Sequence, residues 1–113
     1  MSGKVTITED QAFELAEMFR LMGDHSRLRI IFACLHGPVC VSDIATQLKL
    51  SPSLVSHHLR LLRAARVVKA ERQGKQIFYS AADEHIRCVL TDMAHHVAEP
   101  AEHAAAVPSA AVA

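Results

Sequence analysis

The sequence predicts a mainly α-helical domain with one β-hairpin before its last helix. Its 113 residues suit a single domain, and they contain no internal repeat. Apolar residues recur at helical spacing as far as residue 67, and the spacing then changes to the alternation that is typical of strands. Helical spacing returns over residues 83–99, so one last helix follows the hairpin.

Capping residues and helix breakers delimit two N-terminal helices. Thr8 suits the start of a helix over residues 8–22, and Gly23 ends it. Asp24 then caps a second helix over residues 25–36, which the segment GPVC breaks. Apolar residues recur in both helices at spacings of three and four, which favours one buried face on each.

The centre of the chain predicts a helix-turn-helix. A short helix covers residues 41–50, and a longer one begins with Ser51 as its N-cap and Pro52 in its first turn. Two strands follow around Gly74, which tolerates the positive φ of a tight turn. Helices in this order, followed by a hairpin, are typical of a winged helix-turn-helix.

We expect residues 1–7 to form an N-terminal arm, residues 8–100 the folded domain and residues 101–113 a flexible tail. Pro100 ends the last helix, and the Ala-rich sequence after it is of low complexity. No apolar run approaches the ~20 residues of a membrane span, and the N-terminus lacks the layout of a signal peptide. Three cysteines without framework spacing favour a reducing cytoplasm.

Positive charge is concentrated in the middle of the chain, although the formal net charge is zero. Seven basic residues lie between positions 49 and 80 against one acidic residue, Glu71, and both flanks are acidic. This pattern favours a surface that faces a polyanion such as double-stranded DNA. The alternative is a solvated basic face on an ordinary helical domain. No glycine-rich phosphate loop and no nucleophile with an obvious base are present, so we do not expect an enzyme.

Two places carry candidate DNA contacts. One is the N-terminal part of the longer helix, which enters the major groove in helix-turn-helix proteins, and the other is the hairpin tip, where a wing follows the backbone or the minor groove. The candidate DNA-binding residues are Ser51, Ser53, Ser56, His57, Arg60, Arg72, Gln73 and Lys75. The neighbouring His58 falls on the inward side, and we expect it to be a core histidine.

The last helix carries chelating side chains at both ends. His85 and His96 share one face, because eleven residues make about three helical turns, and Glu99 follows on the same side. Along the axis the two histidines lie roughly 16 Å apart, which is too far for one metal ion. In two antiparallel copies, however, the start of one helix meets the end of the other. The candidate metal ligands are then Asp83 and His85 of one chain with His96 and Glu99 of the other.

Two imidazoles and two carboxylates suit zinc or cobalt in tetrahedral geometry. Asp83 is expected to reach the shared face from a frayed first turn of the helix. The alternative is that all four side chains are ordinary solvent-facing residues of an amphipathic helix.

The stretches FRLMGDHSRLRIIFACL and LSPSLVSHHLRLL, together with RQGK and YS in the hairpin, resemble the ArsR/SmtB family of metal-sensing bacterial repressors over about residues 10–100. The resemblance implies a homodimer, joined largely through its first and last helices, that leaves operator DNA when an inducer binds. It also implies a zinc site on the C-terminal helix, because Asp83-x-His85, ten residues and then His96-x-x-Glu99 match one branch of the family; Co²⁺ or Ni²⁺ are further candidates. In that branch the histidine that matches His96 signals through a backbone carbonyl, whose counterpart here lies near Arg66.

The resemblance also assigns expectations to the cysteines. Other members bind soft metals through Cys-x-Cys at the start of the third helix, but Ser42 follows Cys40 here, so we expect no complete site of that kind. Members that sense oxidants or sulfide join the second and last helices by a disulfide. A thiol-based repressor that uses Cys34 and Cys88 is therefore the alternative function. A contribution of Cys40 or His103 to a further metal site stays open, as do the operator sequence and the regulated genes.

Overall fold

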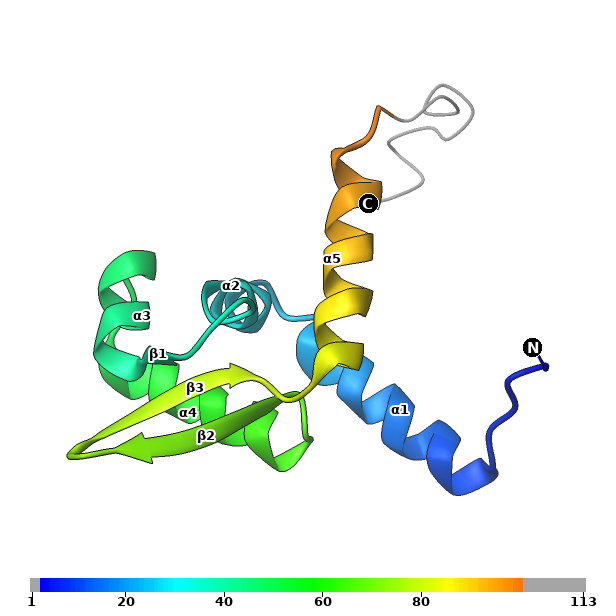
Figure 1. Ribbon diagram of the computed structural model, residues 1–113, viewed down its shortest axis with the longest axis horizontal. Coiled ribbons are helices and arrows are strands. Elements are labelled where there is room, and N and C mark those ends of the chain that lie inside the picture. The colour runs from blue at the N-terminus through cyan, green and yellow to red at the C-terminus, as the bar shows by residue number, and fades with distance from the viewer. Residues whose placement is uncertain (1–2, 101–113) are drawn as a thin grey trace.

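The computed structural model describes residues 3–100, which form five helices and three strands (Figure 1). In chain order these are α1 (Glu9–Met22), α2 (His25–Ala33), β1 (Val39–Cys40), α3 (Val41–Leu48), α4 (Pro52–Ala64), β2 (Val68–Gln73), β3 (Gln76–Ala81) and α5 (Glu84–Ala98). Their order confirms the predicted helical domain with a hairpin before its last helix. The expected tail, residues 101–113, lies outside the described residues. None of the described helices is long and apolar enough to cross a membrane.

Hydrogen bonds at the helix N-termini confirm the capping residues expected from the sequence. At α1 the Thr8 hydroxyl accepts from the Gln11 N–H at 3.1 Å, and the Gln11 side chain accepts from the Thr8 N–H at 2.9 Å, which completes a capping box. At α2 the Asp24 carboxylate accepts from the Arg27 N–H at 3.1 Å. Each cap stabilises its helix by about 1 kcal/mol.

α2 and α4 end earlier than predicted, and α3 ends at Leu48 instead of continuing to residue 50. α2 ends at Ala33, with Cys34 as its C-cap, instead of continuing to residue 36. α4 ends at Ala64, and Arg66 then adopts a left-handed backbone conformation with φ 63° that leads the chain into β2. Few residues other than glycine adopt such a φ. The apolar pattern continued through the ends of α2 and α4 and therefore gave no sign of them.

The strands form one antiparallel sheet in the order β1-β3-β2. The hairpin pairs Gln73 with Gln76 at its tip, where Gly74 has the expected positive φ, 66°. β1 was not predicted, because a strand of two residues has no period of its own. It exists through its pairing with β3, in which Val39 lies opposite Tyr79, forty positions further along the chain.

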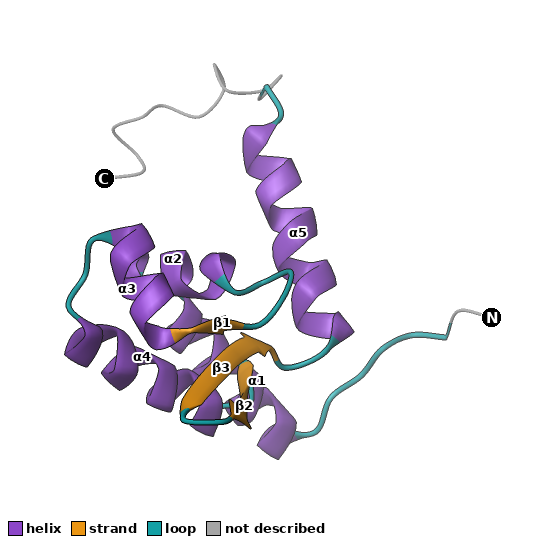
Figure 2. Ribbon diagram, turned by 60° about the vertical axis from the view of Figure 1, so that its left-hand side comes forward, coloured by secondary structure: helices purple, strands orange, loops and turns teal. Residues whose placement is uncertain are grey.

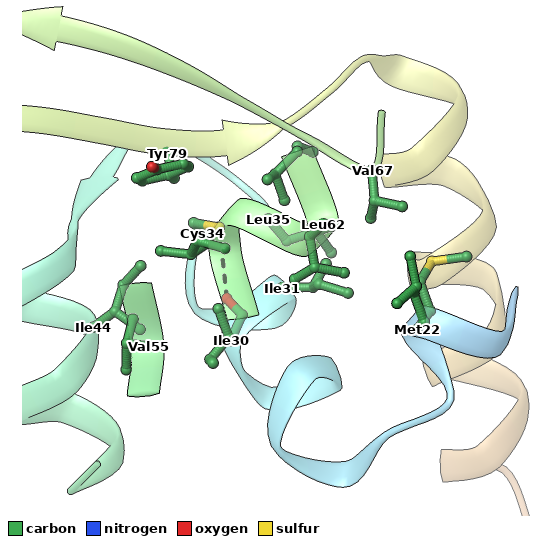
Figure 3. Close-up of a cluster of buried hydrophobic side chains, with 14 of the residues drawn as sticks. Met22, Ile30, Ile31, Cys34, Leu35, Ile44, Val55, Leu62, Val67 and Tyr79 are labelled. Carbon is green, nitrogen blue, oxygen red and sulfur yellow. Dashed lines mark hydrogen bonds between the residues drawn. The ribbon is translucent and has the colours of Figure 1, made fainter. Parts of the chain in front are cut away.

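The hydrophobic core lies between α2, α3, α4 and the sheet (Figure 3). Its largest fully buried side chains are Ile30, Ile31, Cys34, Leu35, Ile44, Val55, Leu59, Leu62, Val67 and Val68. Leu54 of α4 is apolar but 39 % exposed, because the buried stripe of this helix is narrow and centred on Val55 and Leu59. This core fixes one face of α4 and leaves the opposite face to solvent.

The two terminal helices contribute little to this core. Leu21 and Met22 are the buried residues of α1, and Leu90 is the buried residue of α5. The C-terminal half of α5 projects away from the rest of the molecule in both views (Figures 1 and 2). The Cα radius of gyration is 16.4 Å, compared with about 13 Å for a compact domain of this length. A single chain therefore leaves both helices with uncovered apolar surface.

Candidate nucleic-acid interface and metal site

The outward face of α4 carries four of the predicted DNA-binding residues. Ser53, His57 and Arg60 are exposed and Ser56 is half-buried, and their spacing of three and four places all of them on one side of the helix. The Arg60 guanidinium donates to the Ser56 hydroxyl at 3.1 Å. This contact keeps the positive charge on the outward face, where a phosphate or a base edge is within reach of a docked helix.

Ser51, a further predicted contact, has a structural role in the free protein. Its hydroxyl accepts from the Leu54 N–H at 3.1 Å and so caps α4. The hydroxyl retains its own proton as a donor, so the cap leaves it able to donate to a phosphate oxygen. For a contact with DNA, the Ser51 hydroxyl can therefore supply one hydrogen-bond donor and its remaining lone pair.

The remaining predicted DNA contacts lie at the tip of the hairpin, which packs beside α4 and extends away from it (Figure 1). Arg72, Gln73 and Lys75 are all exposed there. The Arg72 guanidinium donates to the Gly74 carbonyl at 3.2 Å, so it folds over the turn instead of pairing with an acidic residue. The tip thus presents two positive charges, Arg72 near the end of β2 and Lys75 in the turn.

His58 lies on the inward side of α4, as predicted, and is half-buried. Its Nδ1 accepts a hydrogen bond of 3.2 Å from the Nε–H of Arg27, at the start of α2. Burial and the adjacent Arg27 charge lower the pKa of His58 below its usual value, with a smaller opposing effect of Asp24. Sequence reasoning missed Arg27, because the contact joins residues 31 positions apart that lie on different helices.

The first pair of candidate metal ligands lies together at the start of α5. Asp83 is the N-cap of this helix: one carboxylate oxygen accepts from the Ile86 N–H at 3.1 Å, and the other lies 3.5 Å from Nδ1 of His85. The expectation of a frayed first turn was therefore wrong, since a fixed, extended cap residue brings the carboxylate to His85. The Ile86 N–H, followed by His85, lowers the pKa of Asp83, so this carboxylate is ionised at neutral pH.

The second pair lies at the opposite end of the same helix. His96 is in the last turn of α5, and Glu99 is the C-cap residue, whose N–H donates to the His95 carbonyl at 3.1 Å. All four candidate ligands are exposed, and the His85 side chain is 94 % exposed. Within residues 3–100 no three His, Cys, Asp or Glu side chains come close enough to hold a metal ion. One chain therefore supplies two separate pairs of ligands.

Arg66, the expected coupling residue, borders the first ligand pair. A cavity of about 550 Å³ is lined by Arg66 together with Asp83 and His85. On its other side the Arg66 guanidinium forms an ion pair with Glu14 of α1. The turn after α4 is thus in contact with α1 and close to the start of α5. Glu14 gave no signal in the sequence, because its partner lies 52 residues away.

Apolar side chains of α1, α2 and α5 enclose a groove of about 540 Å³. Phe19 is 55 % exposed, Met93 55 % and Val97 78 %, although all three line this groove. Phe32 and Val89 complete its exposed rim. Side chains of this size are seldom left in water over a continuous surface unless another protein covers it.

The cysteines are poorly placed for the thiol-based alternative. Cys34 is fully buried, its thiol donates to the Ile30 carbonyl at 3.5 Å, and burial raises its pKa to about 11. Local desolvation and the Glu84 carboxylate, 3.6 Å from the sulfur, raise the pKa of the exposed Cys88. Because the thiolate is the reactive form, neither residue has the environment of a redox sensor.

Cys40 is buried at the start of α3, with its sulfur 3.3 Å from the Ser42 hydroxyl. The Gln76 amide approaches it from the hairpin at 4.0 Å. Its closest polar neighbours are thus a hydroxyl and an amide, which are poor partners for a soft metal ion. His103, the other residue considered for a further site, lies outside the described residues.

We expect oxidants to leave DNA binding unchanged, since the burial of Cys34 raises the pKa of its thiol and keeps it protonated. Incubation of the metal-free protein with diamide should alter its affinity for DNA by less than about twofold, the range of a neutral surface change. The measurement is an anisotropy titration before and after oxidation, with the Cys88→Ser variant as control. Loss of affinity in the wild type that this variant abolishes would restore the thiol-based alternative.

A family model described as "Bacterial regulatory protein, arsR family" matches residues 24–70, which include α2, α3, α4 and the first part of β2. Among curated proteins, the chain is 43 % identical over 90 residues to a "Transcriptional repressor SmtB homolog" of Synechocystis sp., which covers 80 % of this chain and 68 % of that protein. It is 31 % identical over 99 residues to a "Cadmium resistance transcriptional regulatory protein CadC homolog" of Staphylococcus aureus, with 87 % and 82 % covered.

Among solved structures, the chain resembles a homodimeric winged helix-turn-helix DNA-binding domain from Mycobacterium bovis with a TM-score of 0.78. The match covers 91 % of this chain and 95 % of that one at 23 % identity, so it shows the fold. The predicted winged helix-turn-helix is therefore confirmed.

Proposed function

The chain belongs to the ArsR family of bacterial regulatory proteins, and we propose that it is a metal-responsive transcriptional repressor that acts as a homodimer in the cytoplasm. A regulator, and not an enzyme, is what the sequence led us to expect. In the proposal the metal-free dimer binds operator DNA, and zinc, or alternatively cobalt or nickel, causes its release. The names of the two curated relatives, which refer to repression and to cadmium resistance, support this function.

The placement of the four candidate ligands along α5 is the observation that supports the metal site. Asp83 and His85 are held together at the start of α5, and His96 and Glu99 lie at its other end, with the apolar groove on the adjoining side of the helix. A second copy that covers the groove with its own α5 in the antiparallel direction brings unlike ends of the two helices together. Each of two equivalent sites then receives one pair of ligands from each chain.

The side chains fit a zinc ion by their chemistry. Two imidazoles and two carboxylates are common zinc ligands. The pKa of Asp83 is lowered by its cap hydrogen bond from Ile86, so the group that approaches the cation carries a full negative charge. A bound zinc ion would be held by Asp83 and His85 of one chain with His96 and Glu99 of the other, and its strong bonds to both chains would fix their relative orientation.

The orientation of the subunits determines whether two copies of α4 fit one operator. Half-sites in the major groove are one helical turn, about 34–36 Å, or a multiple of it apart. If metal binding joins the two copies of α5 so that the two copies of α4 lie at another spacing, DNA binding becomes weaker. By linkage, DNA then weakens metal binding by the same factor. Arg66 is the proposed link, because it borders Asp83 and His85 and lies in the turn after α4.

A titration of operator DNA tests this function. The probe is a labelled duplex from the promoter region upstream of the protein's own gene, mixed with the metal-free protein and then with zinc. We expect tight binding without metal and at least about tenfold weaker binding with zinc, within the usual range of coupling between sites. Equal affinity in both conditions would contradict a metal-responsive repressor, and absence of binding in both would contradict a DNA-binding regulator of that promoter.

Arg60 is expected to contribute to operator affinity through its charge. Replacing Arg60 with alanine should weaken binding about tenfold and lower the slope of log K against log salt by about one. Arg20→Ala is the matched control, because Arg20 pairs with Glu17 on α1 and lies on another helix. A variant Arg60→Ala whose salt slope and affinity equal those of the control would remove α4 from the proposed DNA interface.

A further inference from the structure

Arg27 joins three separate parts of the fold through one half-buried side chain. Its backbone N–H donates to the Asp24 carboxylate that caps α2, and its guanidinium donates to the Leu21 carbonyl of α1 at 3.1 Å. The remaining contact is the 3.2 Å hydrogen bond from its Nε–H to Nδ1 of His58 on α4. The same guanidinium therefore holds the end of α1, a terminal helix with uncovered apolar surface, and the inward side of α4.

The contact on α4 is adjacent to the proposed DNA face. His58 is followed by the buried Leu59 and preceded by the exposed His57, and the rings of the two histidines lie 5.7 Å apart. His58 thus connects Arg27 to the turn of α4 from which His57 faces outward. We propose that Arg27 is a positioning residue for DNA binding by α4, acting through a hydrogen bond to His58 that exists only while this imidazole is neutral.

The requirement for a neutral imidazole follows from the direction of the bond. Arginine only donates, so Nδ1 of His58 must offer a lone pair. Protonation removes that lone pair, leaves a half-buried Arg27 N–H without its acceptor and places two positive charges in contact. The charged or titratable groups that act on His58 are Arg27 and Asp24 at the start of α2 and His57 on its own helix. The group of α1 that contacts Arg27 is the neutral Leu21 carbonyl.

The direction of the pKa shift of His58 agrees with a hydrogen bond that needs a neutral imidazole. Burial and Arg27 lower the pKa of His58, so the unfolded chain binds a proton at this position more readily than the folded one. The contribution of His58 to stability is complete above about pH 6.5 and is lost as the pH falls toward the lower pKa of the folded state. Acidification therefore acts against the bond that holds α4.

The inference rests on the proposed DNA contact of α4 and not on the metal site, so its test uses metal-free protein with EDTA. The probe is the promoter duplex described above, titrated between pH 7.5 and 5.5. His58→Gln retains a side-chain oxygen that can accept from Arg27 but does not titrate, and His58→Leu removes the acceptor. His36→Gln, at an exposed histidine outside both proposed sites, is the control.

Relative to His58→Gln, the affinity of the wild type should fall about fivefold more between pH 7.5 and 5.5, the size expected when one hydrogen bond is lost. The His36→Gln control should follow the wild type. His58→Leu should bind about tenfold more weakly at pH 7.5, where a hydrogen bond to a charged group is lost, and His58→Gln should restore most of that loss. A general structural role for position 58 would not produce a pH profile that glutamine flattens.

Parallel pH profiles for the wild type and His58→Gln would overturn the inference while leaving the proposed function in place. Wild-type affinity of His58→Leu at pH 7.5 would also overturn it. Circular dichroism at pH 5.5 shows whether each protein remains folded, and the Arg27 Nε–H resonance in NMR spectra follows the bond itself without DNA. A resonance that is unchanged across the titration of His58 would contradict the inference even if no duplex were bound.

Discussion

Replacing His96 with alanine should abolish the response of operator binding to zinc while leaving metal-free affinity within about twofold of the wild type. The physical reason is that His96 is exposed at the far end of α5 and contributes nothing to the core or to α4. Loss of one of four ligands should weaken zinc binding by at least about 100-fold, since loss of an outer partner alone costs 10–100-fold. Zinc affinity by competition with a chelator and operator affinity by anisotropy are the two measurements.

The neighbouring histidine provides a matched control for this experiment. His95 is equally exposed and lies in the same helical turn, but it is rotated away from the face that His85 and His96 share. His95→Ala should therefore retain the wild-type response. If His96→Ala still released DNA at the same zinc concentration, or if His95→Ala lost the response instead, the assignment of the ligands would be wrong.

A second large effect is expected at the apolar groove. Replacing Met93 with glutamate should separate the proposed dimer, because the isologous contact would bury the new carboxylate from both chains. One unpaired buried charge costs about 3 kcal/mol, which weakens dimerisation about 100-fold. The chain itself should still fold, because Met93 is 55 % exposed in the single chain. Sedimentation measures the oligomeric state, and operator binding should weaken in parallel.

Ser42→Glu is a suitable comparison for the change at Met93. It adds the same charge at an exposed position of α3, outside the groove. This variant should sediment as the wild type does. If Met93→Glu remained dimeric at the same concentration, the second copy would have to bind elsewhere, and antiparallel pairing through α5 would lose its support.

The sequence predicted best those features that are determined by neighbouring residues. Ser51 and Pro52 correctly marked the start of α4, Thr8 and Asp24 the starts of α1 and α2, and Gly74 the hairpin turn. Each acts over a turn of helix or of hairpin, so the relevant partners are within four residues. The separation of the two ligand pairs on α5 likewise required only the rise and period of a helix.

Features that depend on distant partners were not predictable in this way. β1 forms through its pairing with Tyr79, Arg66 pairs with Glu14, and Arg27 holds His58. Asp83 is an instructive case, because its proximity to His85 was expected for the wrong reason. A frayed turn was assumed where the carboxylate is in fact fixed by its bond to the Ile86 N–H.

The ion pair between Glu14 and Arg66 adds a physical connection to the proposed coupling. It joins α1 to the turn after α4, and that turn borders the cavity at Asp83 and His85. Both side chains are more than half exposed, so the pair contributes at most about 1 kcal/mol to stability. Its significance is therefore geometric, because it connects α1, the turn after α4 and the cavity at the first ligand pair.

The most direct test of the central claim combines two inactive variants. Asp83→Ala and His96→Ala each lack one ligand in both sites of their homodimers, so neither should bind zinc tightly. In a mixed dimer one site lacks both residues, and the other contains Asp83 of one chain and His96 of the partner intact. After subunit exchange in an equal mixture, we predict tight zinc uptake at about one quarter of the wild-type number of sites. Tight zinc uptake by either variant alone, or no tight zinc uptake by the exchanged mixture, would contradict a metal site shared between two chains.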